Sequence, residues 1–274
     1  MNSTVNLTSN MSSALYALKA TSTTMESTNS RLATGLKVNS ALDDPLAYFA
    51  ADEHTADANN LSLLDSNMSE AVQTIEAASN GLEAIKDLLD DAKALCNSAL
   101  SAETDSEVTS YMNQINDILS DIDEVADDSG YSSVNLLSGT DTSLTVAFTN
   151  SSGGSSITVS GIDASSDGLN LTKASDWTTA SDSTIETFVT TLTTAKTTVR
   201  SNDSKLSSQL SVIDTRQTFT NSQIETLNTG AANLVNADTN EESAKLLALQ
   251  TQQSLGTNAL SIASQSMQSV LNLF

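Results

Sequence analysis

An apolar side chain recurs every three or four residues along one stretch of this sequence, between positions 61 and 99. Steps of three and four place such side chains on one face of an α-helix. The stripe predicts a long amphipathic helix with coiled-coil spacing, starting at Pro45 with Asp43 or Asp44 as its cap. Its members are Leu61, Leu64, Met68, Ala71, Ile75, Ala78, Leu82, Ile85, Leu89, Ala92, Cys96 and Ala99.

The same spacing predicts further helices on either side of a short β region. A second helix is expected over about 106–127, and helical spacing returns near Thr184. Within about 136–176, alternating apolar residues in 144–148 and 157–159 predict a β-hairpin. The predicted fold class is therefore mainly α: a long helical rod with a terminal coiled coil and a small β-hairpin region.

Both ends of the chain carry apolar stripes with coiled-coil spacing. Each stripe needs a partner, because an isolated amphipathic helix leaves its apolar face in water. The end segments are poor in charge and rich in Ser, Thr, Asn and Gln, so alone they should form barely stable helices. The spacing leaves open whether they pair within one chain or between copies. The predicted seam is formed by Met11, Leu15, Leu18, Met25, Leu32, Leu246, Leu249, Leu260, Ala263, Met267, Val270 and Phe274.

Charge and hydropathy exclude several classes of partner. The net charge is −23, which repels nucleic acids and acidic membrane surfaces, so we expect neither to be bound. No run of 18 apolar residues occurs, and we therefore expect no membrane insertion. The first 30 residues lack a basic stretch followed by an apolar one, so any export is expected to proceed without a cleaved signal peptide.

The chain offers no convincing catalytic, cofactor or metal site. Neighbouring acidic residues such as Asp90 and Asp91 point away from each other on a helix and are interpreted as solvated. His54, the only histidine, has no ligand at metal-binding spacing. Cys96 falls on the apolar stripe and is interpreted as a small core residue. Because it is the only cysteine, the chain cannot form an intrachain disulfide. We predict that the protein is not an enzyme and needs no cofactor.

Two segments of the chain, residues 31–44 and the last seven residues, carry recognisable motifs. The segment Arg31-Leu-Ala-Thr-Gly-Leu-Lys-Val-Asn-Ser-Ala-Leu-Asp-Asp44 resembles the sequence Arg-Leu-Ser-Ser-Gly-Leu-Arg-Ile-Asn-Ser-Ala-Lys-Asp-Asp of the bacterial flagellin family. The ending Gln268-Ser-Val-Leu-Asn-Leu-Phe274 resembles the family's Gln-x-Val-Leu-x-Leu-Leu terminus. The resemblance spans roughly 1–140 and 185–274, which leaves room for a hairpin but for no large outer domain.

The resemblance implies a domain organisation and a function. Residues 1–43 and 235–274 would form an inner coiled-coil domain, and residues 44–234 a helical rod domain with the hairpin. The implied function is that of a structural subunit polymerising into the extracellular flagellar filament used for swimming. Implied partners are further copies of the chain, an export chaperone, and cap and junction proteins, with export through the flagellar type III apparatus. A hook–filament junction protein and an intracellular coiled-coil adaptor are the alternatives.

One departure from the family bears on recognition by the animal Toll-like flagellin receptor. Flagellins that this receptor recognises resemble the chain around Asp91, Leu95 and Gln114 but carry an arginine where Asp91 stands and an acidic residue where Gln114 stands. An aspartate cannot imitate the planar, charged fork of arginine. The resemblance therefore implies weak recognition.

Overall fold

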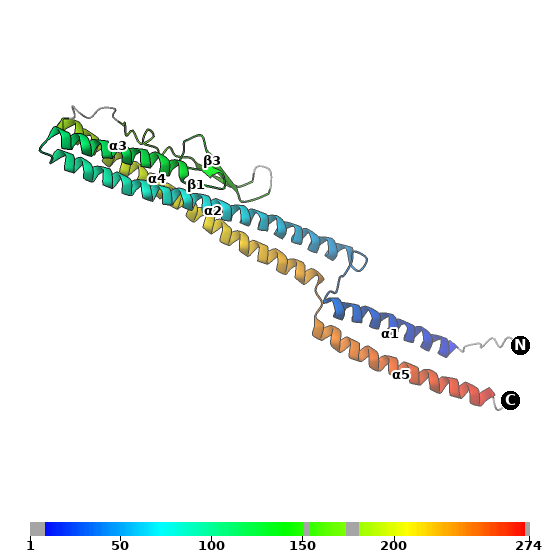
Figure 1. Cartoon of the computed structure of the whole chain (residues 1–274). Helices are drawn as coiled ribbons and strands as arrows, with labels where there is room; N and C mark the ends of the chain where they lie inside the picture. Colours follow the sequence, from blue (N-terminus) through cyan, green and yellow to red (C-terminus); the bar gives the residue numbers. More distant parts are fainter. Residues whose placement is uncertain (1–8, 151–153, 174–180, 272–274) are drawn as a thin grey trace. The chain divides into compact units, whose positions relative to one another are not determined.

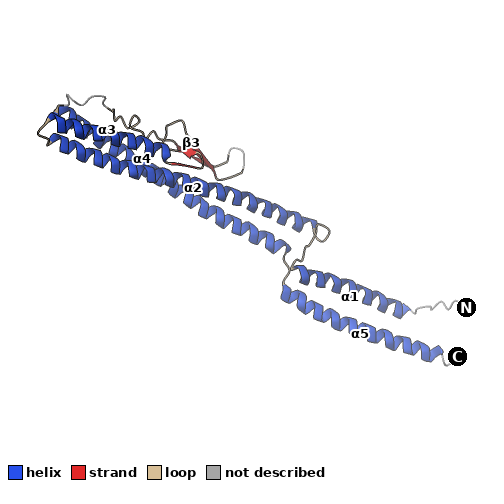
Figure 2. Cartoon of the chain, viewed as in Figure 1, coloured by secondary structure: helices blue, strands red, loops and turns tan. Residues whose placement is uncertain are grey.

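In a computed structural model that describes residues 9–150, 154–173 and 181–271, the chain is mainly α-helical (Figures 1 and 2). This confirms the predicted fold class, including the small antiparallel β region. The helices are α1 (Ser9–Thr34), α2 (Pro45–Leu100), α3 (Asp105–Asp128), α4 (Asp182–Val235) and α5 (Thr239–Leu271). The strands are β1 (Gly130–Tyr131), β2 (Val134–Asn135), β3 (Ser143–Ala147) and β4 (Ser156–Ser160).

The chain divides into two compact units. Unit 1 contains residues 1–57 and 226–274, and unit 2 contains residues 58–225. The boundaries fall inside α2 and α4, so both helices contribute residues to both units.

Unit 2 is built around the apolar stripe that the sequence shows in α2. Every stripe residue from Leu64 to Ala99 is buried, and Leu61 is partly buried. The helix starts as expected: Asp44 Oδ1 accepts from the backbone N–H groups of Leu46 and Ala47, each at 3.1 Å, which makes Asp44 the cap and Pro45 the first helical residue.

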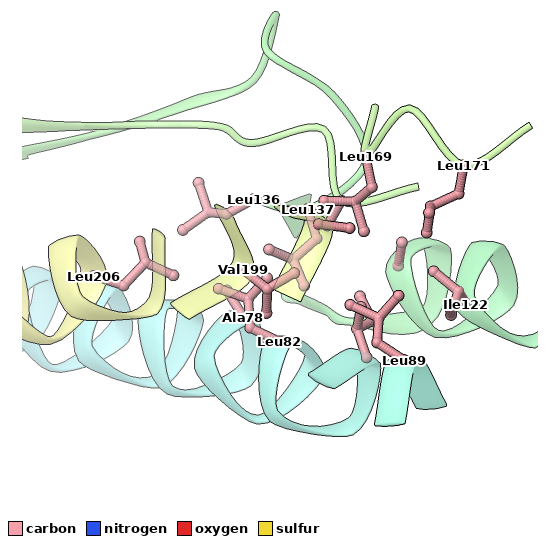
Figure 3. Packing of buried hydrophobic residues seen from close by; sticks show 14 of the residues in the cluster. Ala78, Leu82, Leu89, Ile122, Leu136, Leu137, Leu169, Leu171, Val199 and Leu206 are labelled. Atoms are coloured by element: carbon pink, nitrogen blue, oxygen red, sulfur yellow. The ribbon is translucent and has the colours of Figure 1, made fainter. Parts of the chain in front are cut away.

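Helices α3 and α4 complete this core. Figure 3 shows Leu82 and Leu89 of α2 in one cluster with Ile122 of α3 and Val199 of α4. Polar contacts between α2 and α4 show that the two helices run antiparallel. In one of them, Ser79 Oγ donates to Asp203 Oδ1 at 2.6 Å. The other pairs are Lys196 with Asp90 at 2.5 Å and Gln217 with Ser69 at 2.7 Å.

A capping box fixes the start of α3. Thr104 Oγ1 accepts from Glu107 N at 3.3 Å, and Glu107 Oε2 accepts from Thr104 N at 3.2 Å. Each residue thus satisfies a backbone donor of the other, which defines the helix terminus about one residue before the predicted start.

The predicted hairpin is present as β3 and β4, paired antiparallel from Ser143–Ser160 to Ala147–Ser156. Gly154 lies in the connection between the strands, whereas Gly153 lies outside the described residues. A second strand pair, β1 with β2, has no counterpart among the expected elements. In the turn between these strands, Ser132 and Ser133 adopt left-handed backbone conformations, with φ of 47° and 67°. Serine is not a residue that predicts this conformation, so the sequence gives no sign of the turn.

The segment after β4 contributes to the core, although its sequence suggests only a polar connection. Leu169 and Leu171 are buried in the same cluster as Leu136 and Leu137 (Figure 3). Asp123 of α3 fixes this segment, because its carboxylate accepts from Ser166 N at 2.7 Å and from Lys173 Nζ at 2.5 Å. Two charge-assisted bonds thus attach a loop of little periodicity to α3.

Candidate assembly interface

The two terminal helices pair within unit 1. Helix α1 ends at Thr34 and is followed by Gly35, whose φ of +73° suits a residue without a Cβ. The chain beyond it pairs with the α4–α5 connection: Ala237 N donates to Gly35 O at 2.9 Å, and Lys37 N donates to Val235 O at 2.7 Å. These bonds hold the end of α1 beside the start of α5.

From this connection the two helices run antiparallel, side by side (Figure 1). Arg31 meets Glu242 near the connection, and Leu18 meets Gly256 further along. In both pairs the two residue numbers add up to nearly the same sum, so the antiparallel register between α1 and α5 is constant along the helices. It places Met25 level with Leu249 along the pair. The structure therefore brings together residues that are more than 200 positions apart in sequence.

Gly256 sets how closely the helices approach. A Cβ atom placed on Gly256 would lie 2.7 Å from Leu18 Cδ1 and 3.5 Å from Leu18 Cγ. The first distance is shorter than any ordinary carbon contact. The missing side chain of Gly256 thus provides the space that the Leu18 side chain occupies.

Two threonines stand in the interior face of α1. Thr28 is only 1% exposed, and Thr21 is also buried. The Thr21 hydroxyl donates to Ala17 O, one turn earlier, at 2.9 Å. A hydroxyl satisfied by its own helix is tolerated in an interior position, but it contributes less apolar burial than a leucine would. The contact between α1 and α5 is therefore weakly hydrophobic.

An ion pair joins α1 and α5 near the connection between α4 and α5. Arg31 Nη1 donates to Glu242 Oε1 at 3.1 Å, and the Glu242 residue is buried. Lys245 Nζ lies 3.8 Å from Glu242 Oε2. Arg31 is in the last turn of α1 and Glu242 in the first turn of α5, so each charge also complements its helix dipole.

The predicted seam residues fall into three groups. Leu15 is 52% exposed in the single chain. Phe274 and the side chains of Met267 and Val270 lie outside the described residues. The remaining seam residues are partly buried: Met11, Leu18, Met25, Leu32, Leu246, Leu249, Leu260 and Ala263.

The pair also presents apolar side chains to solvent. On α5, Leu247, Leu255 and Ile262 are exposed, and we call these three residues the outer stripe of α5. On α1, Tyr16 and Leu15 are exposed. None of the 11 basic and 34 acidic residues falls within 1–18 or 246–274, so these segments carry no side-chain charge in a chain of net charge −23.

The residues of the predicted receptor-recognition region lie in unit 2. Asp91 and Gln114 are exposed, whereas Leu95 is partly buried against the core. Gln114 Nε2 donates to Ser110 O of its own helix at 3.2 Å. The position thus presents one carboxylate and one self-bonded amide to solvent.

The side chains of Cys96 and Asp43 have structural roles. Cys96 is fully buried, and this burial raises the pKa of its thiol to about 11. The backbone N–H groups of Asn39 and Ser40 donate to Asp43, which holds the pKa of that carboxyl below its usual value. Among the described residues, no group of His, Cys, Asp and Glu is arranged to hold a metal ion, and no helix is both long and apolar enough to cross a bilayer.

The chain is similar to known proteins along both halves of its sequence. Residues 5–142 match the bacterial flagellin N-terminal helical region, and residues 189–274 match the bacterial flagellin C-terminal helical region. Flagellin FljM of Caulobacter vibrioides is 34% identical over 98% of each chain. A flagellin of Brucella melitensis is 32% identical over 95% of each chain. A crystal structure of Bacillus cereus flagellin has a TM-score of 0.49 and 18% identity, covering 56% of this chain and 88% of that chain.

The two family regions and the full-length relatives favour a filament subunit over a hook–filament junction protein or a coiled-coil adaptor. The relatives are of nearly the same length, in line with the expectation that no large outer domain is present. The chain belongs to the bacterial flagellin family and is a subunit of the flagellar filament.

Proposed function

We propose that this chain polymerises through the paired helices α1 and α5. The observation that carries the proposal is the outer stripe of α5, where large apolar side chains stand in water on a segment without charges. Exposed apolar side chains aligned on one helix face mark an interaction site. Copies carrying a net charge of −23 repel one another, so they approach most readily through the segments that carry no charge.

The weak contact between α1 and α5 supports the same conclusion. Buried threonines and a central glycine give the pair little apolar burial of its own. Contacts with neighbouring copies would add the missing burial and stabilise both helices in the polymer. The seam residues Met11, Leu18, Met25, Leu246, Leu249 and Ala263 would then serve intrachain pairing, and the outer stripe would serve contacts between copies.

The domain organisation follows from this division of roles. We propose that residues 1–43 and 235–274 form the inner coiled-coil domain, which lines the filament core. Residues 44–234 would form the surrounding layer, with the hairpin of β3 and β4 in it. In this arrangement the negative charges lie mainly in the surrounding layer, where solvent and salt screen them.

Further partners and the cellular location are part of the proposal. An export chaperone would cover the amphipathic C-terminal segment before assembly, and export would use the flagellar type III apparatus. Cap and junction proteins would contact the same terminal helices at the filament ends. The assembled polymer would lie outside the cell and would act as a structural protein without catalysis.

Recognition by the Toll-like flagellin receptor should be weak. Asp91 is exposed where a recognised flagellin would carry arginine, and Gln114 replaces an acidic partner. Receptor-expressing cells should respond less to this subunit than to an Asp91→Arg, Gln114→Glu variant. An equally strong response to both proteins would contradict this part of the proposal.

Removal of the terminal segments tests the proposed assembly. A variant lacking residues 1–43 and 235–274 should keep most of the helical signal of unit 2 but should form no filaments when salt and filament seeds are added. The full-length chain serves as the control under the same conditions. Electron microscopy that shows filaments of the shortened chain would overturn the proposal.

A further inference from the structure

Three large apolar side chains near the start of α2 are exposed to solvent. Leu42 is 95% exposed, Leu46 83% and Phe49 60%. Leu46 and Phe49 lie three positions apart on one face of α2, and Leu42 lies in the turn that precedes this helix. The Tyr48 ring meets the Phe49 ring edge-on at 5.6 Å between centroids. We call Leu42, Leu46 and Phe49 the α2-start patch; apolar side chains grouped in this way mark a contact surface.

The backbone around the patch is fixed by the two neighbouring carboxylates. Asp43 Oδ2 accepts from Asn39 N at 3.1 Å and from Ser40 N at 3.0 Å, which closes the turn before the helix. Asp44 caps the helix itself through Leu46 N and Ala47 N. Because both carboxylates bind backbone, the turn is rigid, and the patch is held in solvent before any partner arrives.

We propose that the α2-start patch of one copy docks on the outer stripe of α5 of a second copy. This inference rests on the proposed polymerisation. An open polymer requires two different surfaces to meet, because a surface that binds only its own equivalent gives a closed dimer. Unit 1 supplies two such surfaces on different elements, one at the start of α2 and one on α5.

Charge favours this combination over contact of the patch with itself. The patch is flanked by the acidic residues Asp43, Asp44, Asp52 and Glu53, so two patches face to face would bring eight carboxylates together. The outer stripe of α5 lies in the segment 246–274, which contains no charged side chain. The patch therefore meets apolar side chains there without opposing a second set of acidic groups.

Cross-linking in filaments tests the proposed contact. Cys96 is buried and its thiol has a raised pKa, so introduced cysteines supply the accessible thiols. Filaments of the double variant Leu42→Cys, Leu255→Cys are treated with a short bis-maleimide and examined on a denaturing gel. We expect a ladder of covalent trimers and larger oligomers, whereas each single variant should give nothing beyond dimers.

The matched control moves one cysteine to an exposed residue of unit 2, in the double variant Ser106→Cys, Leu255→Cys. Filaments of the Leu42 variant that give no more oligomer than this control would overturn the inference. An unmodified chain that forms no filaments would instead contradict the proposed function. The two failures are therefore distinguishable.

A charge variant keeps the test decisive if a cysteine variant does not assemble. Leu42→Lys should leave the helical content of the subunit unchanged, because Leu42 is almost fully exposed, and should raise the critical concentration for assembly roughly tenfold or more. Ser106→Lys is the control. An unchanged critical concentration for Leu42→Lys would overturn the inference.

Discussion

The guanidinium of Arg31 donates a hydrogen bond of 3.1 Å to the carboxylate of Glu242, across 211 positions of sequence. The bond joins the last turn of α1 to the first turn of α5, so it sets the point from which both helices run in register. Glu242 is buried, whereas the Arg31 side chain is partly exposed. Loss of the arginine would leave this buried carboxylate with Lys245, at 3.8 Å, as its remaining ion-pair partner among the described residues.

We expect Arg31→Ala to weaken the pairing of α1 with α5 by about 1–2 kcal/mol, less than for a fully buried pair because Arg31 is partly exposed. Amide hydrogen exchange in α1 of the subunit should accelerate by roughly tenfold. Lys19→Ala, which removes an exposed cation of the same helix, is the control. Equal exchange in both variants would show that the ion pair does not fix the register.

Gly256→Leu should separate the terminal helices, because the Leu18 side chain occupies the space beside Gly256. Overpacking of this kind costs about 1–3 kcal/mol, and filament assembly should be lost. The exchanged pair Gly256→Leu, Leu18→Ala restores a similar total volume and should recover assembly. Sedimentation of assembled filaments provides the measurement. Failure of the exchanged pair to recover would mean that Gly256 has a role other than close approach to Leu18.

Gly81→Ala should destabilise unit 2 without touching the terminal helices. A Cβ at Gly81 would lie 2.0 Å from Ser129 Oγ and 2.8 Å from Leu137 Cδ1, in the core between α2, the end of α3 and the loop after it. We expect a loss of about 1–3 kcal/mol in the free energy of unfolding, seen as a lower Tm by circular dichroism. Ala84, exposed on the same helix, offers the control Ala84→Ser. An unchanged Tm for Gly81→Ala would mean that the surrounding loop moves away at little cost.

Asp123 should make the attachment of residues 163–173 sensitive to acid. Burial raises the pKa of Asp123, but the bonds from Lys173 and Ser166 lower it by more, so the folded pKa lies below the usual 3.8. The stabilisation is thus present above pH 3.8 and is lost as the pH falls through the lower, folded pKa. Hydrogen exchange of residues 163–173 should rise in that range. In Asp123→Asn the exchange should already be fast at pH 7; slow exchange in that variant would contradict the assigned role.

The helices of this fold could be predicted from the sequence because their signals are local. The stripe in α2 and the cap at Asp44 each depend on residues a few positions apart, and both are present in the structure. The strands β3 and β4 follow from alternation in the same way. The segment with Leu169 and Leu171 shows no period, so its burial against Leu136 and Leu137 could not be predicted.

The interface between α1 and α5 was only partly predictable. Apolar spacing identified Leu18 and Met25, but it also selected Leu15, which is half exposed. The interior positions include Thr21 and Thr28, which no apolar pattern marks. The Arg31–Glu242 pair depends on the register between distant segments, and that register appears only when the two helices are placed side by side.

The burial of Cys96 has a consequence for the life of the filament outside the cell. An oxidising environment converts accessible thiols into disulfides or sulfenic acids, but the only thiol of this subunit is enclosed in the core and resists ionisation. Neighbouring subunits should therefore acquire no disulfide links as the filament ages. Its cohesion stays noncovalent, so filaments taken apart by heat or acid should yield intact subunits that can be reused for growth.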